Sequence, residues 1–459
     1  MSGPQILIKR VKIFDGHREG AGGLKNVLIE KNLIKKIVPS GSGEIDGLSA
    51  NALHVDGDGK RLTPGLIDMH QHLMLGGPSG LYSTANDIDF ATCGAIAAQH
   101  MYAHKLMKGV TTVRDIAGNS LGLAKAVKMG WVTGPRIYSS GPPIAPTGGH
   151  FDIGGWNQNR GQNESVLMGQ AAICDGPLEV MKQCRWNFRK GAAFIKVMPG
   201  GGVATEYDPL EVVNHTAEEL KAAVAIAEDN KTYVAAHAYR DDAVNRALDA
   251  GVRCVEHGFL MSEETVKRLA RENIIFSLQG YMAGVAFAHP EKVPWYTAEQ
   301  IRKAKDVHTG TMQVVEWVKK HKVFTVSGSD MFAEQWPILK KNITIEVSLF
   351  GFSPEEALEH CTGNASEVLA MSGPARNPYR EGPLGVIREG AYADVLLWGK
   401  DPLQDISVLE NEEELKLIVK DGDIFKNTTV PPDHKLYRPA PSMRISAPPP
   451  RLDKGGCCC

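Results

Sequence analysis

Eight short apolar segments alternate with longer helical stretches through the middle of the chain, and this alternation constrains the fold more than any other feature. Two helix starts between or after them carry capping-box patterns, Thr216 with Glu219 and Ser353 with Glu356. Strand–helix alternation repeated eight times predicts an α/β fold, a parallel (β/α)8 TIM barrel. The predicted strands are residues 66–70, 110–115, 136–141, 194–198, 233–237, 253–257, 274–278 and 323–330.

Both ends of the chain carry a different pattern. Short runs between residues 6 and 39 are rich in β-branched side chains and predict antiparallel strands. The same pattern returns at residues 393–399 and 415–425, where Asp421-Gly422 predicts a hairpin turn. From residue 431 the chain is rich in proline, which predicts a tail that buries little surface.

Composition excludes several classes of protein. The 459 residues are 43% hydrophobic and 23% charged, which is typical of a globular protein. A net charge of −2 argues against binding nucleic acid through bulk charge. No apolar run reaches the roughly 18 residues of a membrane span, and no signal-peptide pattern opens the chain, so we expect a cytoplasmic protein. The eight cysteines, three of them at Cys457–Cys459, are not spaced as in a disulfide framework, so we expect none.

Polar side chains mark the C-terminal ends of the predicted strands, where the active sites of TIM barrels lie. Residues two apart on a strand share a face, so His70 and His72 can point the same way. Each residue alone could be an ordinary strand-end polar group or a helix cap. Together, imidazoles and a carboxylate in one cavity suit zinc or a similar divalent ion. The strand-end residues are His70, His72, His237, His257 and Asp330.

Lys196 lies within the apolar run Phe194–Met198 of the fourth predicted strand. An exposed lysine is the ordinary alternative, but the run offers no clear polar side. Burial disfavours the ammonium form and lowers the pKa of the amine. A neutral amine can add carbon dioxide and become a carbamate, whose two oxygens can bridge two metals.

Several other features have simpler interpretations. Gly200–Gly202 is interpreted as room for a ligand beside the metals rather than as a phosphate cradle. Arg114-Asp115 is interpreted as a structural ion pair, with carboxylate binding by Arg114 as the alternative. Two long connections, residues 142–177 and 279–297, follow the third and seventh strands and are expected at the barrel mouth.

The run from Pro64 to His72, PGLIDMHQH, resembles the PGLID-x-H-x-H signature of the metal-dependent amidohydrolase superfamily. The Thr147–His150 segment is similar to the branch of Xaa-Pro-type dipeptidases, N-acyl amino acid hydrolases and ochratoxinase. The resemblance covers roughly residues 5 to 426. It implies that both chain ends join in one small β-sandwich domain. The implied division is 1–64 and 375–430 for the sandwich, 65–374 for the barrel and 431–459 for the tail.

The resemblance also implies two divalent metal ions, with zinc expected. His70, His72, carbamylated Lys196 and Asp330 would hold one ion, and Lys196, His237 and His257 the other. A hydroxide shared by the metals would attack the amide or peptide bond of a dipeptide or N-acyl amino acid. Asp330 would carry the proton to the leaving nitrogen.

His150 and Tyr239 match positions where the superfamily contacts substrate; their ordinary alternatives are a loop histidine bonded to backbone and a rim tyrosine. The resemblance further implies that the protein acts on a small-molecule substrate and forms a homo-oligomer. A lactonase, decarboxylase or lyase acting on a secondary metabolite with the same metal site is the alternative function, because loops select the substrate. A non-enzymatic relative would lack ligands that this chain retains.

Overall fold

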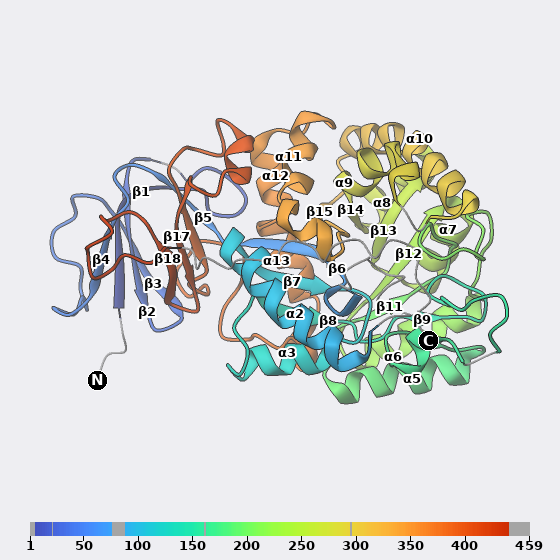
Figure 1. Cartoon of the computed structure of the whole chain (residues 1–459). Coiled ribbons are helices and arrows are strands. Elements are labelled where there is room, and N and C mark those ends of the chain that lie inside the picture. The colour runs from blue at the N-terminus through green and yellow to red at the C-terminus, as the bar shows by residue number, and fades with distance from the viewer. Residues whose placement is uncertain (1–4, 21, 76–87, 160–161, 294–295, 440–459) are drawn as a thin grey trace, which may run out of the picture.

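The computed structural model describes residues 5–20, 22–75, 88–159, 162–293 and 296–439. Figure 1 shows two lobes side by side: strands from both chain ends form the smaller one, and helices surround strands in the larger one. The predicted fold class, a TIM barrel with a small β-sandwich domain, is confirmed. Among these residues no helix is long and apolar enough to cross a membrane. The tail cysteines Cys457–Cys459 lie outside the described residues.

All eight predicted segments form barrel strands. β6, β7 and β8 pair in parallel, and the others lie in a second parallel sheet that also contains β9 (Ile144–Ala145) and β10 (Ala172–Ile173). Backbone hydrogen bonds connect the two sheets: Ala193 N donates to Ser139 O (2.8 Å) and Asp330 N to His70 O (2.9 Å). The eight strands are β6 (Leu66–Gln71), β7 (Val110–Asp115), β8 (Arg136–Ser139), β11 (Ile195–Val197), β12 (Val234–Arg240), β13 (Cys254–Leu260), β14 (Ile275–Leu278) and β15 (Thr325–Ser327).

Helices follow the barrel strands on the outside (Figure 1). Both predicted capping boxes are present, at Thr216 and at Ser353, and α10 begins with a third at Thr297. The helices are α2 (Phe90–His104), α3 (Leu121–Lys128), α4 (Glu164–Leu167), α5 (Pro177–Lys190), α6 (Ala217–Asp229), α7 (Asp241–Ala250), α8 (Glu263–Arg271), α9 (Gly280–Gly284), α10 (Ala298–Lys320), α11 (Lys341–Ser348), α12 (Pro354–His360), α13 (Gly363–Ala370) and α14 (Gly373–Arg376).

The smaller lobe joins strands that are more than 300 residues apart in sequence. β16 pairs antiparallel with β5, Leu396 lying opposite Thr63. The predicted hairpin at Asp421-Gly422 is confirmed, and both residues have positive φ, as a tight hairpin turn requires. The strand order is β18 (Asp423–Asn427), β17 (Leu415–Lys420), β16 (Val395–Trp398), β5 (Arg61–Pro64), β1 (Gln5–Ile13), β2 (Lys25–Glu30) and β3 (Leu33–Pro39), with β4 (Leu53–Asp56) beside β1.

A buried arginine connects the two lobes. Arg136, at the start of β8, donates to both carboxylate oxygens of Asp394 (3.2 Å each) and also bonds Asp421. Its guanidinium lies 4.1 Å from the ring centroid of Tyr392. Arg136 and Asp394 are almost fully buried, so neither charge can be satisfied by water if the other is removed.

We therefore expect Arg136→Met to lower the free energy of unfolding by about 3–5 kcal/mol, because it leaves a carboxylate buried without its partner. The urea midpoint of the first unfolding transition, followed by circular dichroism, measures the change. The control is Arg302→Met on α10, whose ion pairs with Glu299 and Asp306 are solvent-exposed and should contribute less than about 1 kcal/mol. Equal effects of the two substitutions would contradict the role of Arg136.

Candidate active site

One cavity at the C-terminal ends of the barrel strands is lined by all the predicted metal ligands and substrate contacts. The cavity lies at the mouth of the barrel, where the strand ends bring residues from distant parts of the chain together. The predicted residues that line it are His70, His72, His150, Lys196, His237, Tyr239, His257 and Asp330.

Asp330 lies among three of the histidines. Its Oδ1 atom is 3.0 Å from His72 Nε2 and 3.4 Å from His70 Nε2, and its Oδ2 atom is 4.0 Å from His257 Nδ1. Potential ligand atoms of His70, His257 and Asp330 all lie within 4.8 Å of one another. Burial would raise the pKa of Asp330, but these imidazoles hold that pKa below its ordinary value, so the carboxylate is ionised.

His237 completes the imidazole cluster. Its ring centroid is 4.5 Å from that of His257 and 4.0 Å from that of His150, on which it stacks. Burial lowers the pKa of both His237 and His257 well below the ordinary value. Both rings are therefore neutral, which is the form that binds a metal ion.

Lys196 is the most unusual member of the site. The residue is 1% exposed, and its Nζ atom has no hydrogen-bond partner among the described residues. Burial lowers the pKa of the amine to about 8, against the opposing effect of Glu256. A buried amine without a partner is costly, which indicates that a further group belongs beside it. Imidazoles, a carboxylate and this amine together fit a zinc-type centre.

The backbone is constrained at the same place. His257 and Asp330 have φ values of +73° and +52°, in the left-handed region that non-glycine residues rarely adopt. Such conformations cost about 1–3 kcal/mol each and persist only where the surroundings determine them. Here His257 N donates to Gln279 Oε1 (3.0 Å), and Asp330 N donates to His70 O (2.9 Å). The two strand ends are thus held so that both side chains face the cavity.

Sequence reasoning did not find the ion pair behind His150. His150 Nδ1 lies 2.9 Å from Asp208 Oδ2, and Lys303 Nζ donates to Asp208 Oδ1 (3.2 Å). Lys303 also donates to the carbonyl oxygens of Gly202 (2.8 Å) and Thr205 (2.7 Å). Because Nδ1 is engaged by the carboxylate, Nε2 is the nitrogen of His150 that remains for a ligand.

The predicted role of the glycine triplet needs correction. A Cβ atom on Gly202 would lie 2.2 Å from the His150 ring, and one on Gly201 would lie 2.0 Å from Pro209 O. Gly202 N also donates to Asp208 Oδ2 (2.7 Å). The glycines therefore make room for the His150 ring and for close backbone packing rather than for a ligand beside the metals.

The predicted Arg114-Asp115 ion pair is also wrong. Arg114 points into the barrel, where its Nη2 atom donates to Glu256 Oε1 (2.7 Å). Asp115 instead accepts hydrogen bonds from Leu73 N (2.7 Å) and Ser120 Oγ (2.5 Å). Neighbouring residues on a strand face opposite ways, which separates the two charges.

The two long connections reach the site as predicted. Phe151 belongs to the first, and Met282, Phe287 and Tyr296 belong to the second. Phe332 stacks on His72, with ring centroids 5.5 Å apart. The walls around the polar cluster are therefore largely apolar and aromatic.

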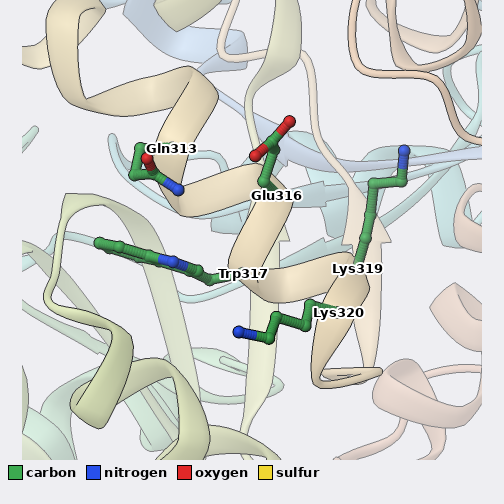
Figure 2. A pocket seen from close by; sticks show the side chains of 5 residues that line it. All are labelled: Gln313, Glu316, Trp317, Lys319 and Lys320. Carbon is green, nitrogen blue, oxygen red and sulfur yellow. The ribbon is translucent and has the colours of Figure 1, made fainter.

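A second hollow lies on the outside of α10. Figure 2 shows that its five lining side chains all come from this one helix. None of them is a histidine, and the hollow lies outside the barrel mouth, so it provides no comparable ligand set. The lining residues are Gln313, Glu316, Trp317, Lys319 and Lys320.

A TIM barrel with such a cluster at its mouth is typical of hydrolases, and comparison with known proteins agrees. Residues 61–425 match the amidohydrolase family. The chain is 28% identical to ochratoxinase from Aspergillus niger over 384 aligned residues. This alignment covers 81% of this chain and 77% of that enzyme.

Solved structures extend the similarity. A crystal structure of an amidohydrolase matches this chain with a TM-score of 0.82 at 30% sequence identity. The match covers 92% of this chain and 99% of the amidohydrolase chain. A prolidase complexed with N-methylphosphonate-L-proline has a TM-score of 0.82 at 28% identity, covering 92% and 100%. The chain belongs to the amidohydrolase family. It is a hydrolase that acts on amide bonds.

Substitution of Gly202 tests the positioning of His150. We expect Gly202→Ala to lower kcat/KM for amide hydrolysis by about 100-fold, because a displacement of about 1 Å in a site can have that effect. Gly122→Ala on α3 is the control, since a Cβ atom there meets nothing within 4 Å. Unchanged kcat/KM in a folded Gly202→Ala variant would contradict the packing argument.

Proposed function

We propose that this chain is a binuclear metal-dependent amidohydrolase that cleaves the amide bond of a dipeptide or an N-acyl amino acid. The observation that carries the proposal is the buried amine of Lys196, which faces imidazoles and a carboxylate and has no partner among the described residues. Carbamylation would turn this amine into an anionic ligand.

In this proposal the donor set divides as the family resemblance implies. His70, His72 and Asp330 would hold one ion, and His237 and His257 the other, with carbamylated Lys196 between them. Bound divalent ions, zinc being the expected pair, would supply a water nucleophile of lowered pKa and polarise the scissile carbonyl. The neutral state of the buried imidazoles supports this assignment, because a protonated ring cannot be a ligand.

The remaining steps belong to side chains of the protein. Asp330, ionised among the histidines, would take the proton of the attacking water and give it to the leaving nitrogen. Burial raises the pKa of Tyr239 well above its ordinary value, so its phenol stays protonated and can donate a hydrogen bond to the substrate. His150, oriented by Asp208, would contact the substrate through Nε2.

Support for the substrate class comes from the relatives and from the walls of the cavity. Prolidase, Xaa-Pro dipeptidase and ochratoxinase structures are all similar to this chain. The described lining consists otherwise largely of apolar and aromatic side chains, which suits an apolar side chain or acyl group of the substrate. The cytoplasmic location and homo-oligomeric state stay predictions from the sequence.

The function is tested by a screen of dipeptides and N-acyl amino acids with zinc-loaded protein, products being identified by mass spectrometry. We expect gain of one water by the substrate, and we expect Asp330→Asn to lower kcat by about 100- to 10,000-fold while retaining most of its metal. Loss of carbon dioxide would indicate a decarboxylase instead. Activity of Asp330→Asn near that of the parent would contradict its role in proton transfer.

Lys196→Ala tests the carbamate. We expect this variant to lose most of its metal, as measured by elemental analysis, and to regain part of it when a short carboxylate such as propionate is added. The added carboxylate can supply the oxygens that the carbamate provided. Full metal occupancy in Lys196→Ala without additive would contradict a bridging carbamate.

A further inference from the structure

We propose that Glu256 is a positioning residue of the metal centre, and that it holds the His70 ring so that Nε2 faces the ion. Arg114 in turn holds Glu256 in place. The inference rests on the metal-dependent function proposed above, and it assigns a role to two buried residues that belong to neither the ligand set nor the substrate contacts.

The two ring nitrogens of His70 face different partners. Nδ1 lies 2.9 Å from Glu256 Oε2, and Nε2 lies 3.4 Å from Asp330 Oδ1. An ionised carboxylate only accepts hydrogen bonds, so Nδ1 must carry a hydrogen and donate it in the bond to Glu256. The neutral ring then has its lone pair on Nε2, directed toward the cluster of His257 and Asp330.

Glu256 is held as the anion that this arrangement needs. The guanidinium of Arg114 pairs directly with the carboxylate, and a buried carboxylate beside a guanidinium is favoured in its charged form. Arg114 and Glu256 are both 0% exposed, with 2.7 Å between Nη2 and Oε1. Cys254 Sγ, 3.1 Å away, donates to the same Oε1 atom.

Arg114 is itself held by other barrel strands. Its Nε atom donates to Met69 O (2.7 Å) on β6, next to His70 in the chain. Its Nη1 atom lies 3.4 Å from the hydroxyl of Tyr233. The guanidinium thus bonds groups of β6 and β13 at once, which fixes the position of the Glu256 carboxylate.

Gln279 could compete for His70, since its Nε2 atom lies 3.3 Å from His70 Nδ1. An amide nitrogen is a donor, so it could bond only an unprotonated Nδ1. The shorter contact to the charged carboxylate decides the tautomer, because charge-assisted hydrogen bonds are the stronger ones. Gln279 Nε2 instead donates to Ser277 Oγ (2.9 Å).

Loss of such an orienting carboxylate typically weakens metal binding by about 10- to 100-fold. We therefore expect Glu256→Gln to raise the Kd for zinc by that factor. The measurement is competition with a chromogenic chelator, using metal-depleted full-length protein, zinc alone as the probe, and bicarbonate in every sample. Thermal unfolding of the metal-free proteins is recorded alongside.

Two further variants distinguish the orientation of the His70 ring by Glu256 from the compensation of the buried Arg114 charge. Glu256→Gln leaves the Arg114 charge buried without its partner, which could destabilise the barrel. In the double variant Arg114→Met/Glu256→Gln both charges are gone, so that problem is removed while His70 still lacks its carboxylate. Glu256→Asp keeps the ion pair but shortens the side chain that reaches His70.

A matched control lies elsewhere in the chain. His360 Nδ1 is 2.7 Å from Glu346 Oε2, and Glu346 is also 0% exposed, but neither residue lines the cavity. Glu346→Gln therefore removes a buried carboxylate–histidine bond of the same kind without touching the metal centre. We expect its Kd for zinc to equal that of the parent.

The proposal is supported if Glu256→Asp and the double variant both bind zinc at least about tenfold more weakly than the parent and than Glu346→Gln. It is overturned if the double variant binds zinc as tightly as the parent, because Glu256 would then serve only to balance Arg114. A parent protein that binds no zinc refutes the metal-dependent function itself, and the proposal with it.

Discussion

Burial of charge inside the barrel is the constraint on which the arrangement of the site depends. A charge in a low-dielectric interior must be paired and hydrogen-bonded, or it destabilises the fold. Arg114 forms an ion pair with Glu256, and Lys303 forms one with Asp208. In both pairs the two side chains are fully buried. Each pair then reaches a histidine of the cavity, His70 or His150. These buried charge pairs therefore also set the orientation of two rings that face the cavity.

Lys196 departs from this rule in an informative way. Among the described residues, Lys196 and Lys340 are the buried lysines whose Nζ atoms lack a hydrogen-bond partner, and of these two only Lys196 lines the cavity. A buried amine without a hydrogen bond, in a cavity also lined by imidazoles and a carboxylate, is unfavourable unless something is added beside it. The proposed carbamate and metal ions would remove that cost, so stability and function point to the same missing group.

Much of the fold could be predicted because its signals are local. Alternating strand and helix patterns, capping residues and the Asp421-Gly422 turn each lie within a few residues of sequence. The positions of His70 and His72 followed from strand alternation alone. β4 and β5 were missed because each contains only four residues, which is too short for alternation to be a clear signal.

The supporting residues could not be found this way. Lys303 and Asp208 are 95 residues apart, and no local pattern connects them. Glu256 precedes His257, so simple alternation would place their side chains on opposite faces of β13. His257 has a positive φ at the strand end and lines the cavity, while Glu256 contacts His70 without lining it. Arg114 and Asp115 show the opposite error. An ion pair was predicted between these sequence neighbours, but the strand directs their side chains to opposite faces.

The central claim is that the imidazole cluster and Lys196 form a binuclear metal centre. Anomalous diffraction from a crystal of the zinc-loaded protein, measured on both sides of the zinc absorption edge, tests it most directly. The account predicts two anomalous peaks in the cavity, one bounded by His70, His72 and Asp330 and one by His237 and His257, with electron density beyond Lys196 Nζ that joins them. A zinc-saturated crystal with no peak in this cavity, or with an unmodified Lys196 amine beside a single ion, would contradict it.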